Sequence, residues 1–382
     1  MKQTLYLVIN SLHGGGAERV ASRLSSVWSK DYNLKVISLM PFTDNDYLFC
    51  GEKVSVYDYY KGLTWIGKIK SASKRIDELA IVDKPIAIIA FLQNANLCVS
   101  YTKYKTKKIL SIRNYLDKQY TGVKKFIWTV LVKNQFVKAD YVVSVSKLIN
   151  QEMHSKYGIS SKKCACIYNP YDIDSISVLK VEELSQEETL FFDNHKVLCN
   201  VGHLSAQKGQ YHLIRILPEL LKHDPSYRVA IIGKDNSSYA SKLKELSLAY
   251  GVKDNVLFTG ITSNPYKYIS RSHCFVFTSL YEGFPNALVE AMVCGVPVIS
   301  TDCPSGPSEI LGNNKYGYLE KYDDSVWRDI SEPLTSSEKS IIQDIIKLED
   351  SDIYSHFKNA AIERSSMFTL QEIALEWVKL ID

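Results

Sequence analysis

Short apolar runs alternate with longer amphipathic stretches along most of the chain. The runs are rich in β-branched residues and bounded by turn residues, which predicts buried strands. The amphipathic stretches predict helices, as in 17–29, where Val20, Leu24 and Val27 form one stripe. This alternation indicates an α/β protein with parallel sheets covered on both faces. The predicted strands are 5–10, 35–39, 86–91, 108–112, 141–145, 196–201, 227–233, 255–259, 274–278 and 296–300.

The same pattern divides the chain into two domains. A length of 382 residues is what two domains of ordinary size require. Between the two series of strands lies an acid-rich stretch without clear periodicity. We therefore predict a first domain at 1–178, a linker at 179–195, a second domain at 196–365 and a final amphipathic helix within 366–382.

Composition is that of a globular protein with sizeable cores. Hydrophobic residues make up 46% and charged residues 23% of the chain, and no apolar run approaches the roughly 20 residues that span a bilayer. The apolar run 5–9 is too short for a signal peptide and is predicted to be the first strand. Eight cysteines without framework spacing indicate reduced thiols, as in a cytosolic protein.

Residues 274–301 form the most informative stretch. A buried strand is followed by a polar loop at 279–283, a short helix that Pro285 opens and Gly295 ends, and a second strand. In such a crossover the helix begins at the carboxyl edge of a parallel sheet, where open α/β sheets bind ligands. Free amide groups at the helix start favour an anion such as a phosphate.

Two carboxylates flank this predicted anion site. Asn286 and Glu290 share one face of the helix because they are four residues apart, and Glu282 lies on the loop before it. Both acids can face one ligand. Taken alone, helix capping by Glu282 and a solvated Glu290 explain the pattern at least as well.

Two further loops follow predicted strands and combine glycine with polar residues. The triple glycine 14–16 lets backbone approach a ligand closely, although a tight turn explains it equally well. In the loop 202–210, Gly202 permits a sharp turn and Lys208 offers a compact charge to a diphosphate.

These motifs resemble those of the retaining glycosyltransferases of family 4. EGFPNALVEAMVCGVPVIST (282–301) is similar to the family's signature of two glutamates separated by seven residues, and GGGAERV (14–20) resembles its first-loop motif. The resemblance covers nearly the whole chain and is strongest from 202 to 310. It implies the GT-B fold: two Rossmann-like domains facing across a cleft, with the donor in the second, the acceptor in the first, and the C-terminal helix crossing back to the first.

The resemblance also implies roles for individual residues. Glu282 would hold sugar hydroxyls, Glu290 the ribose hydroxyls, and Lys208 the diphosphate. His203 stands where the family usually has arginine, and Arg113, in SIRN, stands where many relatives have histidine. Arg113 cannot act as a base and would bind phosphate or acceptor, which makes it a catalytic candidate with Glu282 and Lys208. The implied nucleotide-sugar site comprises Gly15, Gly16, Gly202, His203, Lys208, Gly260, Ile261, Glu282, Gly283, Phe284, Pro285, Asn286, Ala287 and Glu290.

No metal or other cofactor is expected. Asp172 and Asp174 have the D-x-D spacing of metal-dependent sugar transferases, but the stretch matches the turn that ends the first domain in the family. Turn-forming residues are the favoured explanation. Retention by front-face attack, the usual assignment in this family, explains why no nucleophile is evident.

Charge is divided unevenly between the two halves. Residues 1–180 contain 27 basic and 14 acidic residues, whereas the remainder contains 19 and 28. Residues 101–138 hold ten Lys or Arg and one acid, among aromatic residues that include Phe126 and Trp128, and 64–79 predicts a second basic amphipathic helix. This composition favours an anionic membrane surface. Single-stranded nucleic acid is an alternative partner, although the sequence contains no RNA-binding signature. A solvated surface without a partner explains the pattern equally well.

Together these features predict a retaining, metal-independent hexosyltransferase. It would move a hexose or N-acetylhexosamine from a nucleotide sugar to a lipid-linked or polysaccharide glycan, as in bacterial capsule or exopolysaccharide synthesis. A UDP-sugar is favoured because CPSGPSEI (303–310) resembles the donor-side loop of relatives that use such sugars. We expect a cytoplasmic protein, peripheral on the inner face of the cell membrane, that binds no nucleic acid. The alternative is a non-catalytic GT-B subunit that binds a partner glycosyltransferase or a glycan.

Overall fold

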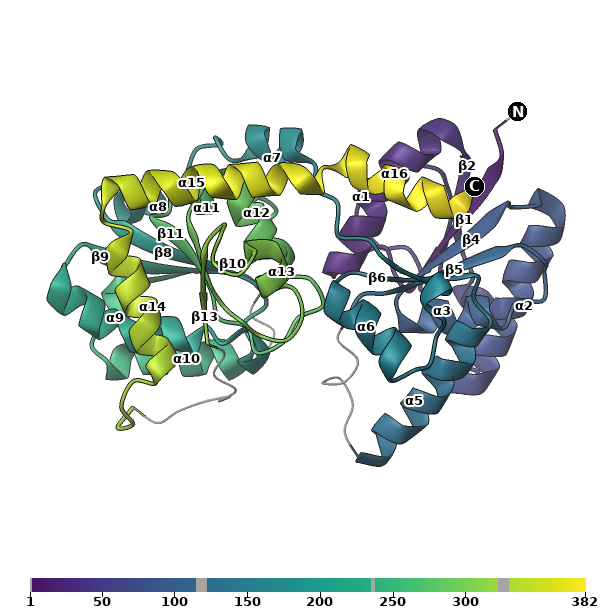
Figure 1. The fold of residues 1–382 in the computed structure, drawn as a ribbon, viewed down its shortest axis with the longest axis horizontal. Coiled ribbons are helices and arrows are strands. Elements are labelled where there is room, and N and C mark those ends of the chain that lie inside the picture. The colour runs from purple at the N-terminus through teal and green to yellow at the C-terminus, as the bar shows by residue number, and fades with distance from the viewer. Residues whose placement is uncertain (1, 115–121, 235–237, 322–329) are drawn as a thin grey trace. The chain divides into compact units, whose positions relative to one another are not determined.

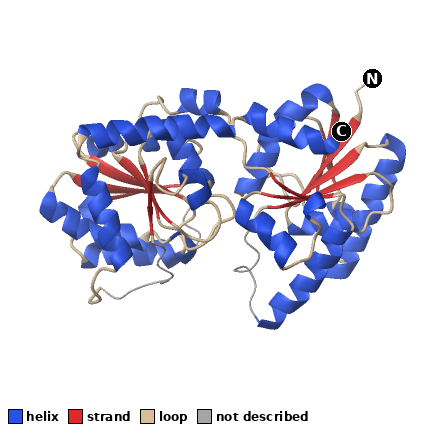
Figure 2. Cartoon of the chain, viewed as in Figure 1, coloured by secondary structure: helices blue, strands red, loops and turns tan. Residues whose placement is uncertain are grey.

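The computed structural model describes residues 2–114, 122–234, 238–321 and 330–382, with the side chains of 122–128 excepted. The chain forms two compact units. Unit 1 consists of Met1–Asp172 and Phe368–Asp382, and unit 2 of Ile173–Met367. In each unit a sheet lies between layers of helices (Figure 2). The predicted α/β class with two Rossmann-like sheets is confirmed.

Unit 1 is built on a seven-stranded sheet. Every pairing between its described strands is parallel, and Val8 of the interior strand β1 lies opposite Ile37 on one side and Ala90 on the other. Residues Leu5–Ile9 are fully buried because helices cover both faces of the sheet, which explains the continuous apolar runs in the sequence. In spatial order the strands are β3 (Glu52–Ser55), β2 (Asn33–Ser38), β1 (Thr4–Ile9), β4 (Ala87–Phe91), β5 (Lys107–Ile112), β6 (Tyr141–Ser144) and β7 (Cys164–Cys166).

The C-terminal helix α16 completes the core of unit 1 beside α1 (Figure 1). The Trp377 ring lies edge-on to Trp28 with ring centroids 5.9 Å apart, and it stacks on Phe91 at 5.5 Å. Lys107 Nζ also donates to the Ile381 carbonyl at 2.8 Å. The described helices of unit 1 are α1 (Gly16–Asp31), α2 (Trp65–Asp83), α3 (Gln93–Ser100), α5 (Gly122–Val137), α6 (Lys147–Ser155) and α16 (Leu370–Ile381), with 3-10 turns at η1 (Tyr57–Tyr59) and η2 (Ser161–Lys163). A further 3-10 turn, η5 (Ser366–Phe368), spans the boundary between the units.

Unit 2 repeats this plan with a six-stranded parallel sheet. Its central strand β8 pairs with β9 on one side and β11 on the other, so the loops after β8 and β11 leave the same carboxyl edge side by side. In spatial order the strands are β10 (Val256–Gly260), β9 (Tyr227–Ile232), β8 (Lys196–Val201), β11 (Cys274–Phe277), β12 (Val298–Thr301) and β13 (Tyr318–Glu320).

The segment that we expected to be a linker contains a helix, α8. α8 begins with a capping box, in which Ser185 Oγ accepts from the Glu188 amide and the Glu188 carboxylate accepts from the Ser185 amide. The units divide between Asp172 and Ile173, so this segment belongs to unit 2. The helices of unit 2 are α7 (Ile173–Leu179), α8 (Gln186–Phe192), α9 (Tyr211–His223), α10 (Ser238–Ala249), α11 (Tyr266–Ile269), α12 (Asn286–Cys294), α13 (Pro307–Leu311), α14 (Ser336–Lys347) and α15 (Ser351–Ser365), with 3-10 turns at η3 (Ala206–Lys208) and η4 (Lys253–Asn255).

Two expectations from composition concern the chain as a whole. Within the described residues, no helix combines the length and apolar character needed to cross a membrane. All eight cysteines are free thiols.

Candidate active site

The predicted site residues fall into two groups, one in each unit. Gly15, Gly16 and Arg113 lie at the carboxyl edge of the unit 1 sheet, after β1 and β5. The remaining predicted residues lie in unit 2: Gly202, His203, Lys208, Gly260, Ile261, Glu282, Gly283, Phe284, Pro285, Asn286, Ala287 and Glu290. We call them the unit 1 group and the unit 2 group, and each has its own geometry.

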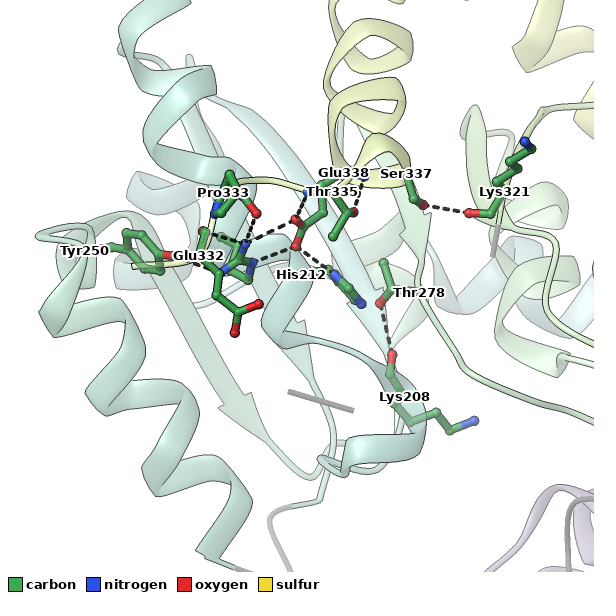
Figure 3. A network of polar contacts seen from close by, with 11 residues as sticks. Lys208, His212, Tyr250, Thr278, Lys321, Glu332, Pro333, Thr335, Ser337 and Glu338 are labelled. Carbon is green, nitrogen blue, oxygen red and sulfur yellow. Dashed lines mark hydrogen bonds and ion pairs between the residues drawn. The ribbon is translucent and has the colours of Figure 1, made fainter. Parts of the chain in front are cut away.

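In unit 2, hydrogen bonds join the loop after β8 to the loop after β11. Thr278 Oγ1 donates to the Lys208 carbonyl at 2.9 Å (Figure 3), and the Leu280 amide donates to the Gln207 carbonyl at 2.7 Å. Gly209 has φ +63°, and a Cβ there would lie 2.2 Å from the Thr278 carbonyl oxygen. Only glycine permits this approach, so the loop sequence itself brings Lys208 toward β11.

The joined loops bring two predicted catalytic residues into contact. Lys208 Nζ lies 2.5 Å from Glu282 Oε1, with side chains 21% and 13% exposed. Both groups are partly withdrawn from water, so the pair is held more firmly than a surface ion pair. The family resemblance implied a separate ligand for each residue, whereas in the structure the two side chains are partners of each other.

The loop 303–306 packs against the loop that carries Glu282. The Glu282 amide donates to the Pro304 carbonyl at 3.4 Å, and Ser305 Oγ donates to the Gly283 carbonyl at 2.7 Å. Gly306 has φ +106°, and a Cβ there would lie 2.4 Å from Pro285 Cδ. These contacts fix the backbone before α12, whose first residue is Asn286 and whose N-cap, Pro285, supplies no side-chain hydrogen bond. The helix start is therefore a place where amide groups can meet an anion.

Glu290 lies inside unit 2 rather than on its surface. It is 1% exposed, and Tyr266 of α11 donates to its Oε1 at 3.4 Å. It occupies the same face of α12 as Asn286, as the spacing predicted, but its carboxylate points into protein.

His203 and the end of β10 border the same sheet edge. Desolvation, together with the positive charges of Lys208 and Lys234, lowers the pKa of His203 below its ordinary value of 6.5. The ring is thus neutral at pH 7, and the neighbourhood is electropositive. Gly260 has φ +71° at the end of β10, and the next residue, Ile261, is 74% exposed.

A buried ionic cluster, which sequence reasoning missed, anchors α9 behind the Lys208 loop (Figure 3). Glu338 accepts from Arg215 Nε and His212 Nδ1, both at 2.8 Å. Burial opposes the charge of Glu338, but these hydrogen bonds lower its pKa to about 2. Thr335 and Glu338 also form the capping box of α14. The T-x-x-E spacing gave a signal for that box, but nothing in the sequence indicated Arg215 and His212 as partners.

In unit 1 the Glu18 carboxylate packs against the glycine turn. Gly14 has φ +100°, and a Cβ on Gly15 would lie 2.4 Å from Glu18 Oε2. Glu18 is 7% exposed, and Ser11 Oγ donates to its Oε1 at 3.4 Å. Burial raises the pKa of this carboxyl. The glycines therefore make room for a carboxylate of the same motif.

Arg113 is the most unusual group in unit 1. It is 8% exposed, and its guanidinium carbon lies 4.6 Å from the centroid of the Phe91 ring. Among the described residues, none accepts a hydrogen bond from its three guanidinium nitrogens. Burial lowers the pKa of this guanidinium to about 9, although Tyr171 and Glu18 oppose the shift. Buried charges are normally paired, so this side chain is suited to an anionic partner.

A histidine–aspartate pair on the first loop was not predicted. His13 Nδ1 lies 2.9 Å from Asp46 Oδ1, and the His13 side chain is 36% exposed. Asp46 also accepts from the Thr43 hydroxyl at 2.9 Å and from the Thr43 amide at 3.2 Å. Burial alone would raise the pKa of Asp46, but these hydrogen bonds lower it. Because 33 residues separate the pair in sequence, no local pattern could have indicated it.

The structure describes the predicted D-x-D motif but not the side chains of two aromatic residues in the predicted basic segment. In the described part of the chain no group of three or more His, Cys, Asp or Glu side chains could hold a metal, and this covers Asp172 and Asp174. The aromatic residues Phe126 and Trp128 of the predicted basic segment lie outside the described side chains.

Two parallel Rossmann-like sheets, each with polar loops at its carboxyl edge, define the GT-B class of glycosyltransferases. The Anabaena protein HepE, solved with UDP and glucose, has this fold: it matches with a TM-score of 0.78 over 99% of this chain and 98% of its own, at 17% identity.

Sequence comparison gives the family. Residues 181–340 match the model of glycosyl transferases group 1. An uncharacterized glycosyltransferase of Methanocaldococcus jannaschii is 31% identical over 347 residues, 84% of this chain and 85% of its own. N-acetylgalactosamine-N,N'-diacetylbacillosaminyl-diphospho-undecaprenol 4-alpha-N-acetylgalactosaminyltransferase of Campylobacter jejuni is 26% identical over 396 residues, 99% of each chain. The chain belongs to the glycosyl transferases group 1 family and is a glycosyltransferase.

Proposed function

We propose that this protein is a retaining, metal-independent glycosyltransferase of family 4 that transfers a hexose or N-acetylhexosamine from a UDP-sugar to a lipid-linked or polysaccharide glycan. Lys208 and Glu282, 2.5 Å apart beside the start of α12, carry the proposal. A cation, a carboxylate and the start of a helix together match the two ends of a sugar diphosphate.

Binding of the donor gives Lys208 and Glu282 new hydrogen-bond partners. When a diphosphate binds at the start of α12, Lys208 turns from Glu282 to the phosphate oxygens, which carry more charge. Glu282 is then able to accept hydrogen bonds from sugar hydroxyls. The pair keeps both side chains oriented before binding, which reduces the entropy lost on binding.

The nucleoside binds deeper in unit 2. Glu290 accepts the ribose hydroxyls in place of the Tyr266 hydroxyl, which donates to it in the free protein. The base lies against the exposed side chain of Ile261 and pairs with backbone at Gly260. Neutral His203 donates one hydrogen bond to the diphosphate rather than a permanent charge.

The transfer step needs no enzyme nucleophile. The bond between the anomeric carbon and the phosphate oxygen breaks, UDP leaves, and the acceptor oxygen bonds to the anomeric carbon from the same face. The acceptor's proton passes to the departing phosphate oxygen. Lys208 and the α12 amides stabilise the negative charge that builds on UDP, the kind of electrostatic help that contributes most in enzymes.

The acceptor side lies in unit 1. Arg113 binds a phosphate or other anionic group of the acceptor, since its three nitrogens have no hydrogen-bond partner among the described residues. His13 accepts a hydrogen bond from a sugar hydroxyl through Nε2, because its bond to Asp46 puts the ring proton on Nδ1. Buried Glu18 keeps the glycine turn in shape.

The names of relatives support the acceptor class and the stereochemistry. The Campylobacter relative is named for an acceptor attached to diphospho-undecaprenol and for an alpha product. An alpha product from an α-linked donor means retention. We extend both properties to this chain, and with them a role in bacterial surface-glycan synthesis at the inner face of the cell membrane.

UDP release tests the proposal. The purified protein is incubated with UDP-glucose, UDP-galactose, UDP-N-acetylglucosamine or UDP-N-acetylgalactosamine, with and without a polyprenyl-diphosphate-linked N-acetylhexosamine. We expect one donor to give acceptor-dependent UDP release and an α-linked product. Binding of UDP by thermal shift without release from any donor would instead favour the non-catalytic subunit.

A further inference from the structure

The carboxyl end of β9 lies between two parts of the unit 2 group. In the sheet order β10–β9–β8–β11, β9 separates β10, which ends at Gly260, from β8, whose loop carries Lys208. Neighbouring strands lie about 4.8 Å apart, so a ligand that reaches from Gly260 to Lys208 crosses the end of β9. The residues that follow β9 are Gly233 and Lys234. Neither is among the site residues predicted from the sequence.

Backbone contacts hold the end of β9 against the segments on either side. The Gly233 amide donates to the Gly260 carbonyl at 3.0 Å, and the Leu204 amide donates to the Lys234 carbonyl at 3.2 Å. A Cβ on Gly233 would lie 1.8 Å from the Gly202 carbonyl oxygen, so only glycine permits this approach. The main chain at Lys234 is therefore fixed beside the loop that follows β8.

The Lys208 side chain packs on the same loop. A Cβ on Gly202 would lie 3.4 Å from both Cδ and Cε of Lys208, so the lysine stem runs across this glycine. Gly202 thus contacts both Lys208 and the residue before Lys234. The two lysines also act on a common neighbour, because burial, then the charge of Lys208, then the charge of Lys234 lower the pKa of His203.

A diphosphate needs more positive charge than the Lys208–Glu282 pair supplies. The two side chains are 2.5 Å apart, and together they carry no net charge. His203 is neutral at pH 7 because its pKa is lowered. Lys234 is exposed, and its ammonium makes no ion pair or hydrogen bond among the described residues. Exposed lysines are common, so it is the place of Lys234 on the path between β10 and Lys208 that suggests a ligand.

We propose that Lys234 is a second cationic ligand of the donor diphosphate, beside Lys208. The inference rests on the proposed function, since it takes the donor to bind at this edge with its nucleoside toward β10. An ammonium on a flexible stem suits an exposed phosphate oxygen, which needs no fixed geometry. Lys234 also supplies the permanent charge that His203 lacks, and so accounts for a histidine at a position where the family usually has arginine.

Isothermal titration calorimetry of the full chain with UDP and with GDP tests the proposal. Lys234→Met should weaken binding of the nucleotide by roughly fivefold at low salt, which is the upper end of the effect of an exposed ion pair. The loss should shrink at high salt, because charge attraction is then screened. Thermal unfolding without nucleotide should stay unchanged, since the side chain is exposed.

Two further variants separate a charge contact from other effects. Lys242→Met removes an exposed lysine of α10 that also makes no ion pair among the described residues, and it should bind like the parent. The double variant His203→Arg/Lys234→Met should recover most of the lost affinity, because an arginine at 203 puts a permanent charge beside the same diphosphate. His203→Arg alone should gain less, because Lys234 is still in place.

Three outcomes would overturn the proposal. The first is equal nucleotide affinity of Lys234→Met and the parent, and the second is an equal loss in Lys242→Met. The third is an equal gain from His203→Arg with and without Lys234, which would mean that the two positions do not share a ligand.

Failure of the proposed function is seen separately in the parent. A parent that binds neither UDP nor GDP would overturn the proposed function, and this inference with it. A parent that binds only GDP would show that the proposed base is wrong, and the same variants would then decide the role of Lys234 with GDP.

Discussion

The unit 1 group and the unit 2 group satisfy their charges in different ways. In unit 2, Lys208 and Glu282 lie 2.5 Å apart, and Arg215 and Glu338 pair behind them at 2.8 Å. In unit 1, the guanidinium of Arg113 is buried without a hydrogen-bond partner among the described residues. The charges of the unit 2 group are thus paired before a ligand arrives, whereas the buried guanidinium of the unit 1 group has no hydrogen-bond acceptor among the described residues.

A binding site can hold its charged side chains either paired or unpaired before the ligand binds. A paired site costs little to keep folded, but the ligand must displace one partner from the other. An unpaired buried charge destabilises the free protein, and the anion that pairs with it recovers that energy on binding. Such opposite arrangements fit a donor that carries a diphosphate and an acceptor whose anionic group is bound separately.

The largest expected effect is that of replacing Lys208 or Glu282 in the unit 2 group. Lys208→Met and Glu282→Gln should each lower kcat by roughly 10²- to 10³-fold, the usual effect of losing one stabilising group at a developing charge. Because the residues act as a pair, the double variant should lose little more than the worse single variant. Initial rates of UDP release measure this, with Lys222→Met on the surface of α9 as control. Additive losses would show that the two residues act independently.

The ionic cluster around Glu338 should make the stability of the protein depend on pH. The pKa of Glu338 is about 2, below its ordinary value of 4.5, so the stability it contributes is fully present above about pH 4.5 and is lost as pH falls toward 2. Glu338→Gln should therefore cost on the order of 3 kcal/mol at pH 7 and almost nothing at pH 2.

Denaturant unfolding of unit 2 at several pH values measures this effect. Glu363→Gln, on the exposed side of α15, serves as control and should follow the parent at every pH. If the free energy of unfolding of Glu338→Gln differed from that of the parent by the same amount at every pH, the ionised cluster would be ruled out.

A smaller effect of opposite sign is expected in unit 1. Arg113→Met should stabilise the protein by about 1–3 kcal/mol, because it removes a buried charge that has no hydrogen-bond partner. The melting temperature should rise by a few degrees while transfer to the acceptor falls and donor hydrolysis persists. Arg75→Met, which breaks an exposed ion pair, should change stability by less than about 0.5 kcal/mol. A lower melting temperature for Arg113→Met would mean that the guanidinium is stabilised within unit 1.

The smallest effect is expected from chelation. If Lys208 and the α12 amides stabilise the leaving diphosphate, excess EDTA should change the rate of UDP release by less than about twofold. Loss of activity with EDTA and its recovery with manganese would show that a metal ion stabilises the leaving diphosphate. Asp172 and Asp174 would then be the candidate metal ligands.

Some of the fold could be read from local pattern. The apolar runs placed β1, β8 and β11 within a residue or two, because strands buried on both faces must be apolar throughout. Pro285 and Gly295 located α12, since proline suits a helix start and glycine the left-handed residue after its end. The stretch 179–195 was misjudged because α8 is too short to show periodicity, although Ser185 and Glu188 carried a capping signal.

What the sequence determined by itself was the order of the long strands and most helices and the chemistry available at the loop ends, because those depend on residues near one another along the chain. The short strands β3 and β13 were not predicted. The tertiary structure alone decided which charges meet. Lys208 and Glu282 are 74 residues apart, and Arg215 and Glu338 123 apart. Sheet order and close loop packing bring each pair together, while the same packing leaves Arg113 buried beside Phe91 with no hydrogen-bond partner among the described residues. Such distances follow from the arrangement of strands in space, which no local pattern records.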